Sequence, residues 1–273
     1  MKRQSQKPAS RFAIYILALV GVIAMMASLR TCSEKSPFSG TVSHPSGGDT
    51  IDVAIEYSPL SLYRYADTLG GFNYDLLRMM ANNGKFTFKF HPVNSVASAL
   101  EGLDAGRYDI IVADIPVTSD FMARYEYSEP VYLDRQVLVQ KVDSQNMVYD
   151  QLQLAGRTVV VPKNSPAIVR LRNLAKEIGD TIIVKEDSIY GAEQLFILAA
   201  LGEIPLAVVN EHVAHKLASD YSNVDVSTKI SFTQFQSWLM RKADSLFIDS
   251  VNAELRMIKS TLEYRELTSR YFN

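Results

Sequence analysis

The stretch GRYDIIVADIPVTSDFMARYEYSEPVY, residues 106–132, decides the fold of this chain. Its apolar run over residues 108–115 predicts a buried strand, which Pro116 ends. Thr118 then precedes a short helical segment and is of the residue type that caps a helix N-terminus. The stretch is therefore expected to run as strand, turn and helix, followed by an aromatic-Ser-acid-Pro segment at 127–130.

Segments with strand and helix patterns alternate on both sides of this stretch. The predicted strands are 52–57, 85–92, 109–115, 135–141, 158–162, 181–185 and 205–210. The predicted helices are 74–82, one beginning near Ser95, 166–178, 192–201, 246–258 and one near 264–271. Strands separated by helices indicate an α/β architecture with mainly parallel sheets.

The composition is that of an ordinary globular protein. Of 273 residues, 47% are hydrophobic and 21% are charged, and the formal net charge is −2. Because this charge provides no basic field, we expect no nucleic-acid partner.

The N-terminal region predicts export. Residues 12–29 carry no charge and would span about 27 Å as a helix, close to the ~30 Å of a bilayer core. Four basic residues and no acidic one precede this run, which places the N-terminus in the cytoplasm. We therefore expect a cytoplasmic stub with a transmembrane or signal segment over residues 1–30, and a Ser/Gly/Pro-rich flexible linker over 31–50.

The lone cysteine, Cys32, leaves three processing routes open: an uncleaved signal anchor, a lipidated Cys32, and ordinary cleavage. Lipoprotein sites favour small residues before the cysteine, whereas Arg30 and Thr31 precede this one. All three routes export the remainder of the chain, and the expected location is the periplasmic face of the cytoplasmic membrane, by a signal anchor, or a membrane lipoprotein. A single cysteine also excludes an intrachain disulfide.

The strand-turn-helix order of residues 106–132 resembles that of the extracellular solute-binding proteins, family 3, the amino-acid type of periplasmic binding protein. The resemblance runs from about residue 51 to residue 272. It implies a bilobed type II periplasmic-binding-protein fold, with two α/β lobes joined by a two-strand hinge. Lobe 1 is expected at 51–141 plus 230–273, and lobe 2 at 142–229; such lobes close around a ligand.

In lobe 1 the resemblance implies four ligand-binding positions. Tyr57 stands where an aromatic side chain stacks on the ligand, although it could simply pack the strand end. Thr118 opens a helix at the cleft, although capping alone would explain it. Phe121 replaces the Arg that grips the ligand's carboxylate, and Arg124 is either a compensating group or a surface residue. Asp114 introduces an acid where the family favours small or hydroxyl residues.

In lobe 2 the resemblance implies two more positions. Ser165 begins a helix whose N–H groups would hold a carboxylate, although plain capping is the alternative. Pro166 replaces a second hydroxyl residue found there in the family. Asn210 replaces the Asp that binds the ligand's amino group. Both charge anchors for a free α-amino acid are therefore altered.

No catalytic or metal-binding pattern emerges. His212 and His215, with Glu211 beside them, form an i,i+3 pair of the kind that binds zinc, but a third ligand at a convincing spacing is missing, so a solvated helix face is expected. We expect no cofactor, and the sequence contains neither a nucleophile elbow nor a P-loop. The body is also similar to the solute-binding module of membrane-bound lytic transglycosylases, enzymes that carry a separate catalytic domain. The sequence ends at Asn273, and we expect neither that domain nor enzyme activity.

The predicted function is capture of a small polar ligand, an amino-acid derivative or a cell-wall fragment, by a membrane-tethered extracytoplasmic protein. The expected partner is an ABC transporter permease or a peptidoglycan-processing complex. Two alternatives remain open: a non-binding regulatory or scaffold module of the peptidoglycan machinery, and a catalytic subunit.

Overall fold

The computed structural model describes residues 41–42, 50–143 and 146–272. The apolar run 12–29, Cys32 and most of the expected linker lie outside these ranges, and so do the predictions made for them. Across the ranges that are described, none of the helices combines the length and the apolar character needed to cross a bilayer.

The first lobe is built on a six-stranded mixed sheet. Its strands, in spatial order, are β1 (Thr41–Val42), β5 (Thr87–Val93), β2 (Thr50–Glu56), β6 (Ile110–Val112), β15 (Leu239–Arg241) and β7 (Tyr125–Tyr127). β2 pairs in parallel with β5 and β6, whereas β15 is antiparallel to β6 and β7. β1 lies within the expected linker and pairs with β5.

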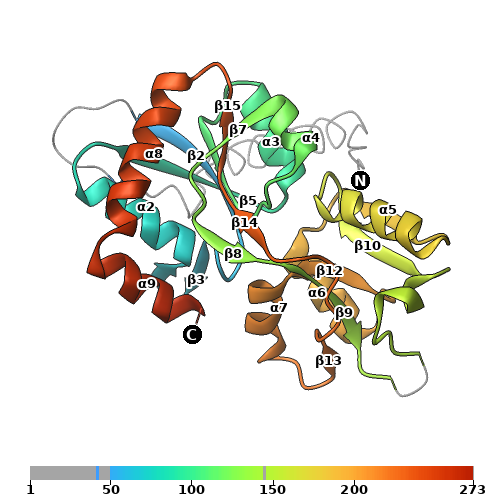
Figure 1. Cartoon of the computed structure of the whole chain (residues 1–273). Helices are drawn as coiled ribbons and strands as arrows, with labels where there is room; N and C mark the ends of the chain where they lie inside the picture. Colours follow the sequence, from blue (N-terminus) through green and yellow to red (C-terminus); the bar gives the residue numbers. More distant parts are fainter. Residues whose placement is uncertain (1–40, 43–49, 144–145, 273) are drawn as a thin grey trace, which may run out of the picture. The chain divides into compact units, whose positions relative to one another are not determined.

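Helices cover both faces of this sheet (Figure 1). One side carries α2 (Phe72–Asn82), α8 (Ser245–Lys259) and α9 (Leu262–Phe272), and the other carries α3 (Val96–Asp104) and α4 (Ser119–Arg124). α3 packs Ala99, Leu100 and Leu103 into a core cluster with β2 and β6. A hairpin of β3 (Tyr63–Tyr65) and β4 (Thr68–Gly70) extends from this lobe.

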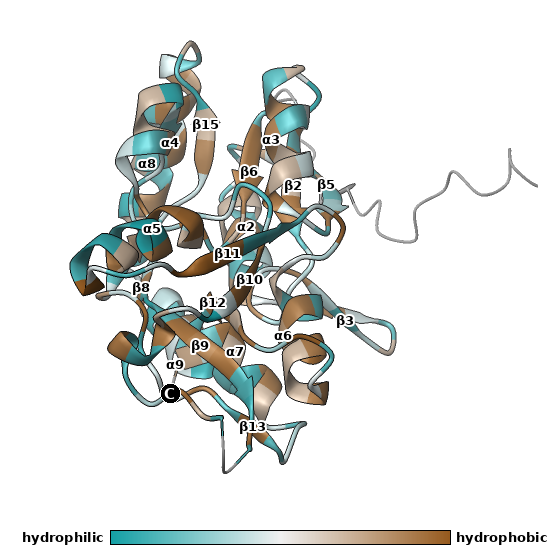
Figure 2. Cartoon of the chain, turned by 90° about the vertical axis from the view of Figure 1, so that its right-hand side faces the viewer, coloured by the Kyte–Doolittle hydropathy of each residue, from teal (hydrophilic) through white to brown (hydrophobic). Residues whose placement is uncertain are grey.

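The second lobe has a five-stranded mixed sheet. The spatial order is β11 (Ile183–Asp187), β10 (Thr158–Pro162), β12 (Ala207–Asn210), β9 (Gln136–Lys141) and β13 (Val224–Asp225). Its helices are the short 3-10 turn η1 (Gln151–Leu154), α5 (Ala167–Ile178), α6 (Ala192–Leu201) and α7 (Glu211–Ala218). Strands such as β9 and β10 are strongly hydrophobic, whereas the helices mix both characters (Figure 2). α5 buries Leu171 and Leu174 against this sheet because its apolar residues recur at helical spacing.

Two antiparallel strands connect the lobes: β8 (Tyr132–Asp134) and β14 (Gln234–Gln236) (Figure 1). β8 leads directly into β9, which pairs antiparallel to β12. β9 therefore belongs to the second sheet, although residues 135–141 were expected in lobe 1. The expectation of mainly parallel sheets is likewise corrected to mixed sheets. Hydrophobic periodicity is the same for both strand directions, so it could not reveal that β9 and β15 run antiparallel.

Candidate functional site

A cavity of about 60 Å³ lies between the lobes and is the candidate ligand site. Lobe 1 lines it at the carboxyl ends of β2 and β6, with Glu56, Ser58 and Asp114. Lobe 2 lines it at the starts of α5 and α6 and at the end of β12. Strand ends and helix N-termini are where α/β proteins usually bind ligands, because backbone groups there are free to contact them.

Asp114 is anchored in the cavity by a network of side chains. Its Oδ1 accepts hydrogen bonds from Ser61 Oγ at 3.3 Å, from Asn73 Nδ2 at 3.3 Å, and from the Tyr132 hydroxyl. Asn73 is itself held by Trp238, whose Nε1 donates to Asn73 Oδ1 at 3.0 Å. Burial raises the pKa of Asp114, and the three hydrogen bonds oppose that rise.

Glu56 is a second carboxylate in the cavity, and it is the last residue of β2. Its side chain is only 8% exposed. Burial is the main cause that raises the pKa of Glu56, and the charge of Asp114 adds to it. Two acidic groups thus share one small space, and burial shifts each of them toward its neutral form relative to a solvent-exposed carboxyl group.

Asn210 joins the lobes. Its Nδ2 donates to the backbone carbonyl of Asp114 at 2.9 Å, so the amide is used between lobe 2 and lobe 1. Near this bond the lobes also touch at Gly191, where a Cβ atom would lie 2.1 Å from the carbonyl oxygen of Asn94. The structure therefore has the lobes in close contact around a small cavity.

Ser165 lies in the cavity wall just before α5. Its Oγ accepts a hydrogen bond from the backbone N–H of Ala167 at 3.2 Å. The hydroxyl therefore caps the helix, as a residue of this type should, while remaining part of the wall.

Two of the expected ligand residues line neighbouring spaces instead. Tyr57 lines a groove of about 620 Å³ together with Tyr63, Tyr65 and Glu193. Thr118 lines a separate cavity of about 150 Å³. Its Oγ1 accepts from the backbone N–H of Phe121 at 3.4 Å, which is the capping bond expected at the start of α4.

Phe121 lines none of the cavities named above. It packs on the lobe 1 core, with its ring edge-on to that of Tyr125 at 6.3 Å. Arg124 does not replace the missing Arg, because its guanidinium is bonded to Asp104 Oδ2 at 2.9 Å and lies over the Tyr125 ring. Its side chain is 61% exposed, which matches the surface alternative.

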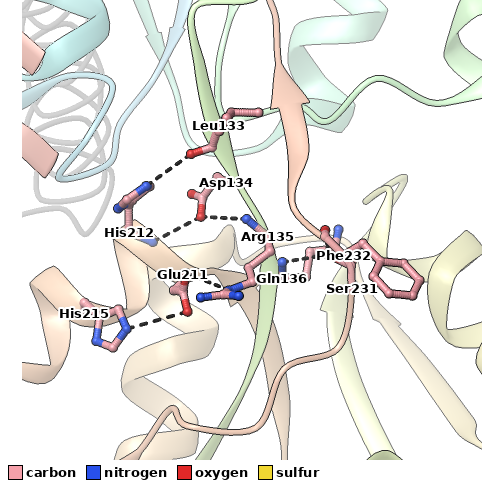
Figure 3. Close-up of polar contacts among 9 residues, drawn as sticks. All are labelled: Leu133, Asp134, Arg135, Gln136, Glu211, His212, His215, Ser231 and Phe232. Atoms are coloured by element: carbon pink, nitrogen blue, oxygen red, sulfur yellow. Dashed lines mark hydrogen bonds and ion pairs between the residues drawn. The ribbon is translucent and has the colours of Figure 1, made fainter.

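The hinge contains a third buried acid, Asp134, at the point where β8 becomes β9 (Figure 3). Its Oδ1 accepts from the backbone N–H of Arg135 at 2.8 Å and from that of His212 at 3.4 Å. Burial raises the pKa of Asp134 from its ordinary value of 3.8 to about 8, while these backbone bonds lower it and the charge of Asp114 raises it further.

The residues weighed as a metal site serve this hinge instead (Figure 3). Glu211 accepts a bond from Arg135 Nε at 2.8 Å, and His215 lies 3.9 Å from the same carboxylate. His212 donates from Nε2 to the carbonyl oxygen of Leu133 at 3.2 Å. Within residues 41–42, 50–143 and 146–272, no three His, Cys, Asp or Glu side chains are grouped in a way that could hold a metal ion.

Glu56 and Gln136 are among the cavity residues that were not predicted from the sequence. Glu56 ends β2 directly after the apolar residues 53–55, and a charge at that place was a usable signal. Gln136 opens the buried strand β9 and is only 4% exposed. No local pattern marked it, because its place in the wall depends on how the second sheet is ordered.

Solved structures of known proteins share this two-lobed architecture. An ancestral arginine-binding protein, solved with arginine bound, superposes with a TM-score of 0.71 at 21% identity, covering 84% of this chain and all 100% of that one. The GluR0 ligand-binding core of Nostoc punctiforme, solved with glutamate, has a TM-score of 0.68 at 18% identity, covering 81% and 99% of the two chains. These likenesses show the type II periplasmic-binding-protein fold that the sequence predicted.

Relatives in sequence include two kinds of protein. The membrane-bound lytic murein transglycosylase F of Aeromonas salmonicida (strain A449) is 28% identical over 233 residues, which is 84% of this chain but 46% of that protein. This chain therefore spans about half the length of that relative. The "Probable histidine-binding protein" of Neisseria gonorrhoeae is 24% identical over 233 residues, covering 80% of both proteins.

The family assignment rests on a match along most of the sequence. The model of the family described as bacterial extracellular solute-binding proteins, family 3, matches residues 50–273. That range includes both lobes apart from β1, the hinge and every residue of the candidate site. The chain therefore belongs to the bacterial extracellular solute-binding proteins, family 3.

Proposed function

We propose that this protein captures a small polar ligand between its lobes and presents the closed form to a partner outside the cytoplasmic membrane. The observation that carries the proposal is the cavity lined by both lobes, at strand ends and helix N-termini, with two strands crossing beside it. Ligand-driven closure needs a site whose halves lie on separate lobes, because the ligand must favour one arrangement over the other.

The ligand is an amino-acid derivative or a cell-wall fragment rather than a standard free amino acid. An Arg–carboxylate pair provides charge-assisted bonds of roughly 1.5–3 kcal/mol each, and Phe121 cannot supply them. The family and the histidine-binding relative support an amino-acid-like ligand, and the transglycosylase relatives support a cell-wall fragment. Asp114, Ser165 and Asn210 contact the ligand in the cavity of about 60 Å³ between the lobes, which we call the inner cavity. Tyr57 contacts it from the groove of about 620 Å³, and Thr118 from the cavity of about 150 Å³.

The setting we propose is the outer side of the cytoplasmic membrane, with residues 12–29 or a lipidated Cys32 as the tether. The partner is a transporter permease or a peptidoglycan-processing complex. We assign the chain no catalysis of its own, and digestion of purified peptidoglycan by the full chain would contradict that assignment.

A thermal-shift panel tests ligand capture on the full chain purified in detergent micelles. It contains amino acids, short peptides and muropeptides. A ligand present at 100 times its Kd stabilises a protein by about 2.7 kcal/mol, which corresponds to a rise in Tm of roughly 5–10 °C for a body of this size. Native mass spectrometry of the same preparation would identify a co-purified ligand directly.

The competing candidate is a regulatory or scaffold module that binds no small molecule. The bond from Asn210 to the Asp114 carbonyl favours it, because the lobes contact each other around a cavity of only about 60 Å³. If no member of the panel shifts the Tm and no ligand co-purifies, capture is contradicted and the module remains. A rise in Tm caused by any panel member would exclude the non-binding module.

A further inference from the structure

The inner cavity presents hydrogen-bond acceptors that have no donor. Asp114 Oδ2 and Gln136 Oε1 are buried, and in the part of the chain that the structure describes neither atom has a hydrogen-bond partner. Gln136 is only 4% exposed to solvent, and Glu56 is 8% exposed. All three side chains line the same cavity, from β2, from the end of β6 and from β9. A buried acceptor without a donor costs roughly 1–3 kcal/mol, so this cavity favours a ligand that donates.

No positively charged side chain from the described ranges lines the inner cavity beside these acceptors. Among the described residues, the lining of the inner cavity contains no Lys, Arg or His. Arg170 lines the separate cavity of about 150 Å³ and is bonded to Glu177 at 2.8 Å. Buried carboxyl groups in this situation either stay neutral or take up a cation from outside.

We propose that the inner cavity binds a primary ammonium or an equally compact organic cation through Glu56, Asp114 and Gln136, and that the ligand needs no α-carboxylate. This inference rests on the proposed capture function and names the chemical class of its ligand. An ammonium offers three donors, one for each of the three acceptor groups. A metal ion is disfavoured, because the described residues contain no group of three or more metal-binding side chains.

The dimensions of the two spaces divide the ligand into a head and a body. The inner cavity of about 60 Å³ has room for only a few non-hydrogen atoms. The groove of about 620 Å³ adjoins this cavity through neighbouring residues: Glu56 lines the cavity and Tyr57 the groove, and Ala192 lines the cavity and Glu193 the groove. The cationic head therefore lies inside while the body follows the tyrosine-lined groove.

The acid–base behaviour of the site agrees with this occupant. Burial raises the pKa of both Glu56 and Asp114, and the groups that face them are acidic or neutral: Glu193 on α6, Asp134 and Tyr132 on β8. A bound cation stabilises the ionised carboxylates, so binding releases protons wherever the free site is protonated. Affinity for the cation therefore increases with pH, by up to tenfold per pH unit for each proton released.

Matched probe pairs test the inference by titration calorimetry on the full chain in detergent micelles. Cadaverine is compared with lysine and agmatine with arginine, each pair differing by one carboxylate. Glucosamine is compared with N-acetylglucosamine, where acetylation removes the cation. At least one amine should bind tenfold or more tightly than its partner, and its affinity should rise at least tenfold from pH 5.5 to 7.5.

Variants assign the binding to this cavity. Glu56→Gln keeps the shape of the side chain and should weaken the amine at least tenfold, and Asp114→Asn should act in the same direction. Glu203→Gln, at an exposed position outside the inner cavity, serves as the matched control and should leave affinity unchanged. If Glu56→Gln or Asp114→Asn fails to fold, the pH dependence of amine binding by the unmodified protein still tests whether the amine binds to buried carboxyl groups.

The outcomes separate this inference from the capture proposal. Tighter binding of the carboxylate-bearing or acetylated partners, or binding that neither pH nor Glu56→Gln alters, would overturn the cation site and leave capture standing. Binding of muropeptides without any binding of amines would do the same. Failure of every probe and every panel member would overturn both.

Discussion

Asp114 owes its position in the cleft to side chains from three distant parts of the chain. Ser61 lies before α2, Asn73 lies in the first turn of α2, and Tyr132 belongs to β8. Trp238, between β14 and β15, holds Asn73 in place. Trp238 is fully buried and its indole N–H is satisfied only through this bond among the contacts described. The charged group of the site thus depends on the interior packing of lobe 1.

Trp238→Phe tests that dependence. The change removes the indole donor and leaves Asn73 Oδ1 as a buried acceptor without its partner. We expect the free energy of unfolding to fall by about 1–3 kcal/mol, measured by urea denaturation followed by circular dichroism. Fluorescence is unsuitable because Trp238 is the only tryptophan in the sequence. Phe235→Leu, on the neighbouring strand β14 and 54% exposed, is the control and should change stability by under about 0.5 kcal/mol. Equal effects of the two changes would contradict the role of the Trp238 bond.

At the scale of elements, the start of α6 faces the loop after β5. Gly191 has an extended backbone, with φ at −83°, so its conformation alone does not require glycine. The requirement comes from the other lobe, because an added Cβ would lie 2.1 Å from the Asn94 carbonyl oxygen. Backbone on both sides of the contact leaves no flexible side chain that could move away.

Gly191→Ala should therefore hold the lobes apart while each lobe keeps its fold. We expect ligand affinity to fall at least tenfold and small-angle X-ray scattering to show a larger radius of gyration. The Tm in the absence of ligand should change little, because the alanine is strained only when the lobes touch. Ser222→Ala, an exposed position on lobe 2, is the control for a comparable small change. A variant with unchanged scattering and affinity would show that this contact does not limit closure.

For the whole molecule, the buried acids determine how stability depends on pH. Glu56, Asp114 and Asp134 all have raised pKa values, and burial is the first cause in each case. The folded protein therefore keeps protons that the unfolded chain loses at mildly acidic pH. Their stabilising contribution is fully present below the unfolded pKa and is lost as pH rises through the folded one.

Asp134→Asn isolates one of these groups. The pKa of Asp134 rises from 3.8 to about 8, so this group alone should reduce the free energy of unfolding by up to about 1.4 kcal/mol per pH unit between pH 5 and 7.5. His212 faces Asp134, and burial lowers its pKa, so its own contribution rises with pH and opposes the trend. The difference between wild type and variant removes most of that background. The variant's stability should decline less steeply in urea titrations across this range.

Asp249→Asn on the exposed surface of α8 provides the control and should parallel the wild type. Parallel curves for Asp134→Asn would mean that Asp134 is ionised in the folded protein at pH 5, contrary to its buried position in the hinge.

Local sequence patterns predicted many elements of the fold because hydrophobic period, caps and turn residues act over a few positions. The strand at 158–162 and the helix at 192–201 were predicted at the bounds of β10 and α6. The hairpin β3–β4 was missed, since three-residue strands leave too short a period to recognise. Of the six expected site residues, the structure brings Asp114, Ser165 and Asn210 to the inner cavity, and it packs Phe121 against the lobe 1 core.

By itself, the sequence determined the α/β class and the family, because both are written in local order and spacing, and it supplied the six expected ligand residues as a prediction. The tertiary structure decided which of those side chains share a space. It put β9 into the second sheet, brought Gln136 beside Asp114 and directed the Asn210 amide to the opposite lobe. These placements depend on strand direction and on contacts between residues far apart in the chain, and local periodicity carries no record of either.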